Sequence, residues 1–287
     1  MENTLERGAR PGEMSQGAAA NYAEVNGLKL YYQVQGAGRP LILLHGGLGA
    51  VEMFAELLPQ LAAGRQVIGV DLQAHGHTAD VDRPLRFEQM ADDIAGLIQH
   101  LGLERADLMG FSLGGGVALR TAIQHPELAR KLVLISTPFK RKSWYPEMRA
   151  GMDQLGPEAA EAMKASPMYH LYASVAPRPE DWPRLVTKVG ELIKRDYDWS
   201  AEIAAVQAPT LLVVGDADGI RTSHTVQFFE LLGGGQADPG WDRAGMPKAR
   251  LAILPDRTHY DILQSPLLVP AVTSFLDAPL AEDTKSR

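Results

Sequence analysis

The chain has 287 residues, 45% of them hydrophobic and 22% charged, which is ordinary for a globular protein able to bury a substantial core. Its net charge of −7 argues against a nucleic-acid or anionic-membrane partner, and no apolar run approaches the ~18 residues of a membrane span. The absence of cysteine excludes disulfides, cysteine-based zinc sites and a thiol nucleophile, and it makes a cytoplasmic location the default expectation.

The chain begins with a segment that has no folding signal. Residues 1–20 hold glycine, charge and small residues without an apolar core, so we expect a flexible tail and not a secretory signal. From residue 21 the pattern changes, and Asn26-Gly27 between two strand-like segments predicts a hairpin. A buried strand is expected over 40–44, and it leads into the glycine-rich stretch at residues 45–49.

The next expected strand, at residues 67–70, is followed by three residues that could suggest a metal site. Asp71, His75 and His77 lie close together in the sequence, but two histidines two positions apart lack a clear third ligand. We therefore expect no metal, and we expect Asp71 and also His45 to organise their loops. Apolar residues at helical spacing over 87–101 then predict a helix.

A candidate nucleophile lies between the next strand and the next helix. Residues 106–109 form an apolar run, residues 117–123 are compatible with a helix, and Gly110-Phe111-Ser112-Leu113-Gly114 lies between them. In this context Gly-x-Ser-x-Gly predicts a strained, tight turn that lifts the serine hydroxyl clear of both elements. The residues two positions to either side must then be very small, and both are glycine. We therefore predict that Ser112 is the nucleophile.

A further strand at residues 131–135 continues the alternation of strands and helices, which predicts an α/β fold with a mostly parallel sheet covered on both faces. Between residues 136 and 208 the alternation stops, and the chain is rich in proline, methionine and aromatic residues. We expect residues 139–200 to form a helical cap over the strand ends. Most of its apolar side chains would form the core of the cap, and some would line a pocket.

The candidate base and acid follow the last two expected strands. A serine needs a histidine to take its proton, and a carboxylate to orient that histidine. The strand over 249–254 is followed by His259, the predicted base. The strand over 209–215 is followed by Asp218, the predicted acid. Three residues past the end of its strand, the Asp218 side chain can reach a histidine at the end of the neighbouring strand. Asp216 is the main alternative acid, and the remaining two alternatives are Asp256 and Asp261.

Two backbone amides are predicted to stabilise an oxyanion. They belong to Gly47, in the glycine-rich stretch, and to Leu113, directly after the nucleophile. Towards the end of the chain, we expect a surface loop at residues 233–247, to which we assign no function. We expect a terminal helix at residues 266–276 and a tail at residues 279–287. The expected core is thus residues 21–138 and 201–278.

These motifs together resemble the α/β-hydrolase fold family over residues 21–278. The matching pieces, in chain order, are His45-Gly46-Gly47, residues 71–78, residues 110–114, Gly215-Asp216-Ala217-Asp218 and His259. The family pattern Gly-x-x-Asp selects Asp218 as the acid. Two positions depart from the family: Thr258 replaces a frequent glycine before the histidine, and Ala74 occupies the first glycine position of the Asp-x-x-Gly-x-Gly loop.

The resemblance implies a cofactor-free, carboxylesterase-like serine hydrolase that cleaves a small to medium, largely apolar ester through an acyl-enzyme on Ser112. It also allows lactone hydrolysis, carbon–carbon bond hydrolysis, perhydrolysis and acyl transfer on the same three residues. Dehalogenase and epoxide hydrolase chemistry is disfavoured, because those relatives carry aspartate at the position of Ser112. A non-catalytic ligand-binding protein on this fold is the alternative from another class. The expected partner is a small-molecule ester, and homo-oligomerisation stays open.

Overall fold

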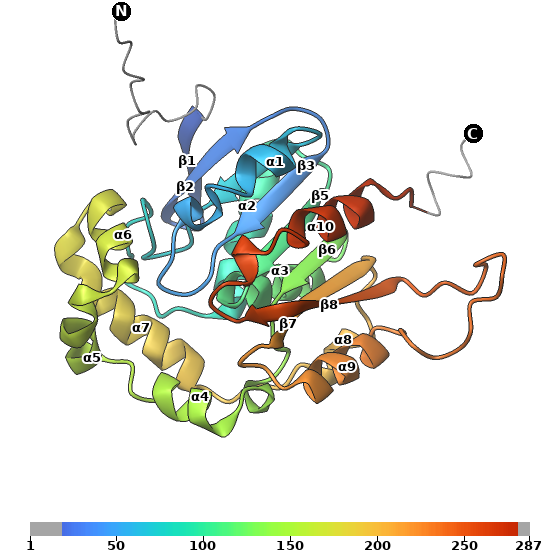
Figure 1. Ribbon diagram of the computed structural model, residues 1–287. Helices are drawn as coiled ribbons and strands as arrows, with labels where there is room; N and C mark the ends of the chain where they lie inside the picture. The colour runs from blue at the N-terminus through green and yellow to red at the C-terminus, as the bar shows by residue number, and fades with distance from the viewer. Residues whose placement is uncertain (1–18, 281–287) are drawn as a thin grey trace, which may run out of the picture.

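The computed structural model describes residues 19–280, and within them eight strands form one sheet (Figure 1). The strands are β1 (Ala19–Val25), β2 (Leu28–Gln35), β3 (Pro40–Leu44), β4 (Gln66–Val70), β5 (Ala106–Phe111), β6 (Ala129–Ile135), β7 (Thr210–Ala217) and β8 (Ala249–Thr258). Their order across the sheet is β1-β2-β4-β3-β5-β6-β7-β8. β2 runs antiparallel to both of its neighbours, and the pairs from β4 to β8 are parallel. The predicted mostly parallel sheet is confirmed.

The antiparallel start of the sheet is the predicted hairpin. Val25 pairs with Leu28, and the two residues between them have positive φ angles of 49° at Asn26 and 76° at Gly27. Asparagine and glycine tolerate this left-handed backbone, and two such residues give a turn that matches the twist of the strands. The turn therefore fixes the register of β1 against β2.

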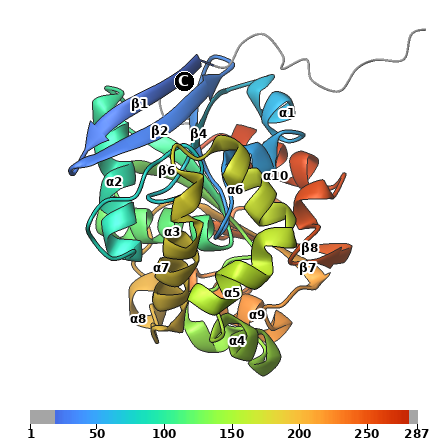
Figure 2. The same ribbon diagram turned by 90° about the vertical axis from the view of Figure 1, so that its left-hand side faces the viewer.

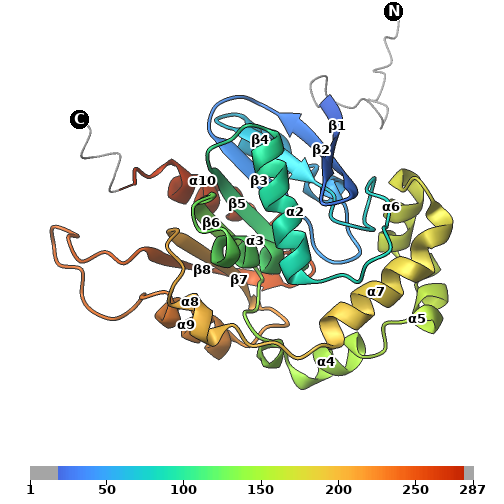
Figure 3. The same ribbon diagram turned by 180° about the vertical axis from the view of Figure 1, so that it is seen from behind.

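Helices cover both faces of the sheet. The helices that flank it are α1 (Leu58–Ala62), α2 (Phe87–His100), α3 (Leu113–Gln124), α8 (Ser200–Ile203), α9 (Thr222–Leu231) and α10 (Leu268–Asp277). Side chains alternate along each strand, so Leu41 and Leu43 pack with α1 and α10, whereas Ile42 and Leu44 pack with α2 and α3. The two layers are seen from opposite sides in Figures 1 and 3.

The segment between β6 and β7 is helical, in agreement with the break in the sequence pattern. It contains α4 (Pro146–Met152), α5 (Pro157–Ala162), α6 (Pro167–Val175) and α7 (Trp182–Lys194), together with short 3₁₀ turns. Proline stands at the first or second position of each of these four helices, where its missing amide hydrogen costs nothing. The four helices gather on one side of the molecule, facing the viewer in Figure 2.

This helical region has an apolar centre around Trp182, whose side chain is fully buried. Its indole nitrogen donates a hydrogen bond to the Ala160 carbonyl oxygen at 2.9 Å, and the rings of Tyr169 and Tyr172 lie 5.5 Å away. These contacts join α5, α6 and α7. Some of the aromatic residues in this region therefore hold its helices together, as the sequence suggests.

The ends of the described chain lie close to the predicted ends of the core. β1 begins at Ala19, two residues earlier than expected, and residues 1–18 and 281–287 of the predicted tails lie outside the described residues. Residues 233–247 connect α9 to β8 as a long loop that extends away from the sheet (Figure 1), and Trp241 on it is fully exposed. Within residues 19–280, none of the helices has the length and apolarity needed to cross a membrane.

Candidate active site

Ser112 occupies the sharp turn between β5 and α3. Its backbone has φ 53° and ψ −115°, an unusual conformation for a residue other than glycine. A Cβ atom added at Gly110 would lie 2.3 Å from the Gly114 carbonyl oxygen, and one added at Gly114 would lie 2.3 Å from the His45 carbonyl oxygen. The two flanking glycines are thus required by close backbone contacts, as the motif predicts.

The glycines that follow allow the start of α3 to pack tightly. A Cβ atom at Gly115 would lie 1.8 Å from the Thr137 hydroxyl oxygen, and one at Gly116 would lie 2.6 Å from the Phe87 ring. Because neither glycine has a side chain, α3 approaches β6 and α2 closely. This packing fixes the position of the helix N-terminus directly after Ser112.

The structure brings Ser112, His259 and Asp218 together from three different strand ends. The Nε2 atom of His259 lies 3.1 Å from the Ser112 hydroxyl oxygen, and its Nδ1 atom lies 3.2 Å from the Asp218 Oδ1 atom. The hydrogen-bond partners assign the proton to Nδ1, which donates to the carboxylate. Nε2 is then free to accept the serine proton. The geometry meets the requirements for an activated nucleophile.

Asp218 is buried, with 6% of its surface exposed, and it accepts two further hydrogen bonds. The Ser136 hydroxyl donates to Oδ2 at 2.5 Å, and the Ile220 amide donates to Oδ1 at 3.0 Å. Burial alone would raise the pKa of Asp218, but the hydrogen bond and charge of His259, with the bonds from Ser136 and Ile220, lower it below its usual value. The carboxylate is therefore held ionised beside the histidine.

Ser136 is a site residue that the sequence does not reveal. It follows β6 directly and has a positive φ of 48°. Its position at the carboxyl end of a central strand is a weak signal, since the neighbouring strands β5 and β7 carry Ser112 and Asp218 at the same edge of the sheet.

The alternative acids have other roles among the described residues. Asp216 is exposed and accepts a hydrogen bond from the Arg257 amide at 3.2 Å. Asp261 accepts from the amide and the hydroxyl of Thr258, at 2.7 and 2.6 Å. Asp256 is exposed and lies in the last part of β8, with a positive φ of 57°. In residues 19–280 it is Asp218 whose carboxylate is within hydrogen-bond distance of the His259 ring.

The two predicted oxyanion donors lie side by side at the serine. Gly47 and Leu113 line the same cavity as Ser112, and a Cβ atom added at Gly47 would lie 3.4 Å from the Leu113 side chain. Leu113 is the first residue of α3, so its amide has no acceptor inside the helix. Within the described chain, neither the Leu113 amide nor the Gly47 amide donates a hydrogen bond. Both amides are available to a substrate oxygen.

Hydrogen bonds to Asp71 organise the loop after β4. The Asp71 carboxylate accepts hydrogen bonds from the Val51 amide at 2.7 Å and from the amide and Nδ1 of His77, each at 2.8 Å. His45 is fully buried and accepts a hydrogen bond from the Leu72 amide at 3.1 Å. Ala74, at the position where the family has glycine, keeps a positive φ of 66°. The loop thus retains the left-handed backbone despite the substitution.

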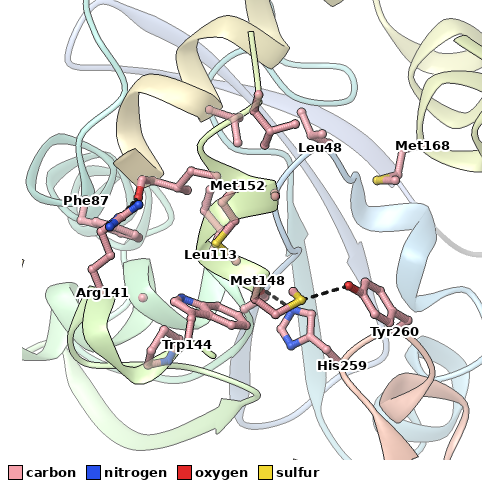
Figure 4. Close-up of a pocket in the computed structure, with 18 of the residues that line it drawn as sticks. Leu48, Phe87, Leu113, Arg141, Trp144, Met148, Met152, Met168, His259 and Tyr260 are labelled. Carbon is pink, nitrogen blue, oxygen red and sulfur yellow. Dashed lines mark hydrogen bonds between the residues drawn. The ribbon is translucent and has the colours of Figure 1, made fainter. Parts of the chain in front are cut away.

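Above Ser112 lies a cavity of about 380 Å³, shown in Figure 4. Its floor is formed by the core, from residues Gly47, Leu48, Phe87, Ser112, Leu113, Gly116 and His259. Its roof comes mainly from the helical segment, from residues Trp144, Met148, Met152, Leu155, Met163, Met168, Val189, Ile193 and Tyr197. At the side, the Tyr260 hydroxyl donates to the Met148 sulfur at 3.4 Å, which connects the histidine loop to the roof.

Charged groups are few in this cavity. Arg141 and Glu147 line it, whereas Lys142 and Arg149 do not. The guanidinium of Arg141 is already engaged, because it donates to the Ile193 carbonyl oxygen at 2.9 Å and to the Asp153 carboxylate at 2.5 Å. The cavity is therefore mainly apolar, and Arg141, the lysine or arginine that lines it within residues 19–280, has an internal counter-ion.

Comparison with known proteins places these features in a family. Residues 39–174 match the family model described as alpha/beta hydrolase fold. The AB hydrolase superfamily protein YisY of Bacillus subtilis is 32% identical over 215 residues, which cover 67% of this chain and 78% of that protein. The 2-hydroxymuconate semialdehyde hydrolase of a Pseudomonas species is 36% identical over 115 residues, covering 39% of this chain and 41% of that protein. The chain thus spans less than half the length of that second relative.

Among solved structures, carboxylesterase CesB of Bacillus subtilis is similar, with a TM-score of 0.69 and 20% sequence identity. The match covers 93% of this chain and 94% of that one. At this identity the likeness concerns the fold.

Proposed function

The chain belongs to the α/β-hydrolase fold family, and from that premise we propose that it is a serine hydrolase that cleaves carboxylic esters through an acyl-enzyme on Ser112. The observation that carries the proposal is the hydrogen-bonded series from Asp218 through His259 to Ser112, which opens into a mainly apolar cavity. We propose that residues 139–200 act as the cap of this enzyme.

The reaction follows from the positions of the three side chains. Nε2 of His259 takes the Ser112 proton while the serine oxygen attacks the ester carbonyl carbon, and the carbonyl oxygen becomes an oxyanion. The Gly47 and Leu113 amides would donate to that oxyanion, and losing one such donor typically costs ~2.7–4 kcal/mol of transition-state stabilisation. The protonated histidine then gives its proton to the departing alcohol oxygen. The acyl group is left on Ser112.

Deacylation repeats these steps with water. His259 takes a proton from water, the hydroxide oxygen attacks the acyl carbon, and the histidine returns the proton to Ser112 as the acid leaves. Throughout, the Asp218 carboxylate holds the imidazole in one tautomer and stabilises it when it is charged. The ester and one water molecule are the only reactants that these steps consume.

The residues of the roof favour a substrate with an apolar acyl or alcohol group. Methionine side chains are flexible and polarisable, so the four in the roof can pack against groups of varied shape. Each buried CH₂ contributes ~0.8 kcal/mol to binding, or roughly fourfold. Esters with short-to-medium or aromatic acyl groups should therefore be cleaved better than acetates, until the chain outgrows the cavity.

A second candidate is hydrolysis of an acidic substrate, by cleavage of either a lactone or a carbon–carbon bond. Arg141 in the cavity favours it, because three of its five N–H groups have no acceptor among the described hydrogen bonds. The similarity to a semialdehyde hydrolase is consistent with this reading. The ion pair with Asp153 weighs against it, since a substrate carboxylate would compete with that internal partner.

The test compares kcat/KM for a neutral aryl ester with that for its carboxylate-bearing analogue, in the parent protein and in Arg141→Ala. We expect the parent to cleave the neutral ester with the higher kcat/KM, and we expect Arg141→Ala to change this preference little. Arg149→Ala serves as the matched control, because Arg149 is a cap arginine outside the cavity. A preference for the anion that disappears in Arg141→Ala alone would replace the esterase assignment with the second candidate. No turnover of either ester would favour a ligand-binding protein.

A further inference from the structure

A short segment that leads from the core into the cap is bonded to the loop that carries the acid. We call residues 139–145 the bridging segment, because it runs from the end of β6 to the start of α4. Trp144 forms an isolated antiparallel bridge with Ile220, and the Tyr145 amide donates to the Gly219 carbonyl oxygen at 3.1 Å. The first stretch of the cap is therefore fixed to the chain just after Asp218.

The side chain of Trp144 packs against the predicted base. Its ring centroid lies 5.0 Å from that of His259 at an interplanar angle of 76°, an edge-to-face arrangement. Phe111 contacts the imidazole from the core, with centroids 5.1 Å apart. Trp144 is 7% exposed, so it excludes water from its side of the imidazole. Figure 4 shows the two rings next to each other, where the roof of the cavity meets its floor.

A buried histidine on α9, His224, contacts the bridging segment at two points, Phe139 and Ser143. The Phe139 amide donates to Nε2 of His224 at 3.5 Å, and Nδ1 of His224 lies 2.8 Å from the Ser143 hydroxyl oxygen. The Ser143 hydroxyl donates to the Lys140 carbonyl oxygen at 2.6 Å, so it must accept from His224. The His224 ring also stacks on Phe139 at 4.2 Å.

These bonds require one protonation state of His224. Nδ1 must carry the proton that Ser143 accepts, and Nε2 must be bare to accept from Phe139. Burial, and then the nearby Lys140 charge, lower the pKa of His224 to about 3, so the neutral ring is the stable form at ordinary pH. His224 is 5% exposed and does not line the cavity.

We propose that Trp144 and His224 are positioning residues for the reaction: Trp144 packs the His259 imidazole against Ser112, and His224 fixes the segment that carries Trp144. The inference rests on the proposed function, because it assigns these residues to the orientation of its base. For His224 this differs from a substrate-binding role, since His224 does not line the cavity, whereas Trp144 does line it and its two roles are separated by the variants below. A small displacement of a catalytic group can lower the rate by up to about 100-fold.

The sharpest test is a pair of substitutions at His224. Glutamine presents one donor and one acceptor at a spacing close to that of the imidazole nitrogens, whereas leucine fills the space with neither. We expect His224→Leu to lower kcat for a neutral ester by about 10- to 100-fold with KM little changed, and His224→Gln to recover most of that loss. Phe228→Leu, which disturbs the contact of α9 with Phe139 without removing a hydrogen bond, is the matched control.

Trp144 provides a second, independent pair of variants. Trp144→Phe keeps an aromatic ring beside His259 and Trp144→Ala removes it. We expect alanine to lower kcat more than phenylalanine does, and to slow phosphonylation of Ser112 by a small fluorophosphonate that does not reach the cap. An effect of Trp144→Ala on KM alone, with unchanged phosphonylation, would make Trp144 a substrate contact and overturn its positioning role.

A spectroscopic readout separates this inference from the proposed function. The proton on Nδ1 of His259, held by Asp218, should give a downfield NMR signal in the parent that weakens or shifts in Trp144→Ala and His224→Leu but persists in Phe228→Leu. This readout needs no substrate, so it stands even if the parent cleaves no ester. If His224→Leu does not fold, Ser143→Ala replaces it. Unchanged signal and kcat in the folded variants, or equal losses in Phe228→Leu, would overturn the inference.

Discussion

The floor and the roof of the cavity are built in different ways. The floor is supported by the turns at strand ends and the starts of helices, where Ser112 and Ser136 have strained positive φ angles and Gly110 and Gly114 are in close backbone contact. The roof consists mainly of helices that have proline at their first or second position, and methionines of this region line the cavity. Backbone contacts admit little change, whereas methionine side chains repack readily. The difference suggests that the floor sets the chemistry and the roof sets the selectivity.

The largest effect should come from the centre of the floor. Ser112→Ala removes the proposed nucleophile but leaves the turn intact, because the hydroxyl lies outside the core. We expect kcat for a neutral ester to fall by about 10⁶-fold, by analogy with other serine hydrolases, with an unchanged unfolding temperature. Residual turnover within about tenfold of the parent, in protein free of contaminating esterase, would be incompatible with the nucleophile assignment.

The next prediction distinguishes the proposed acid, Asp218, from its neighbour Asp216. Asp218→Asn should lower kcat by about 10⁴-fold, because an amide favours the wrong tautomer of the histidine. Asp216→Asn should have a much smaller effect, since Asp216 is exposed and accepts a single backbone hydrogen bond. Steady-state measurement of kcat for the two variants compares these losses. A larger loss in Asp216→Asn would mean that the acid is misassigned.

Buried histidines should make the stability of the fold depend on pH. Burial, as the largest cause, lowers the pKa of both His75, in the loop beneath the floor, and His224, beside the bridging segment, to about 3. Between pH 6.5 and 3 the unfolded chain binds protons that the folded chain excludes, so stability is full above pH 6.5 and falls as the pH drops. At pH 5 each of these histidines should lower the free energy of unfolding by about 2 kcal/mol relative to neutral pH.

Urea unfolding at pH 7 and pH 5 measures this dependence. His224→Gln should remove about 2 kcal/mol of the difference between the two pH values, because glutamine does not titrate. His125→Gln is the control, since His125 is a half-exposed histidine that pairs with Asp92. An identical pH dependence in the parent and in His224→Gln would show that His224 is not held neutral in the fold.

The last prediction compares a glycine beneath the floor, Gly114, with a glycine of the roof, Gly151. Gly114→Ala would bring a Cβ atom to 2.3 Å from the His45 carbonyl oxygen, so we expect it to destabilise the fold by about 1–3 kcal/mol or more. Gly151 in α4 has open space around it, and Gly151→Ala should stabilise the fold by roughly 0.5–1 kcal/mol. Chemical denaturation of both variants and the parent measures the change in the free energy of unfolding. Equal effects would contradict the distinction between floor and roof.

The floor could be predicted from the sequence because each part of it follows a strand and carries a local signal. Buried strands read as continuous apolar runs, and Gly-x-Ser-x-Gly requires a particular backbone at Ser112. The order of strands and the chain positions of Asp218 and His259 then bring the three side chains to one edge of the sheet. Ser136 escaped prediction because a serine with positive φ leaves no mark in composition or periodicity.

The roof could be predicted only as a helical region rich in methionine and aromatic residues. Its helices α4, α5 and α6 have 7, 6 and 9 residues, too few for their apolar pattern to show which face meets the cavity. Met152 and Met163 line the cavity, whereas Trp182 packs among the helices, and nothing in the local sequence distinguishes these roles. His224 showed no signal at all, because its partners Phe139 and Ser143 are distant in the chain.

The central claim is that Ser112 is a reactive nucleophile activated by His259, and covalent labelling tests it most directly. The parent, Ser112→Ala and His259→Gln would each be treated with a fluorophosphonate and analysed by intact mass and peptide mapping. We expect one adduct on the peptide that contains Ser112 in the parent, none at that peptide in Ser112→Ala, and much slower labelling in His259→Gln. An unlabelled parent, or an adduct elsewhere with Ser112 unmodified, would contradict the claim.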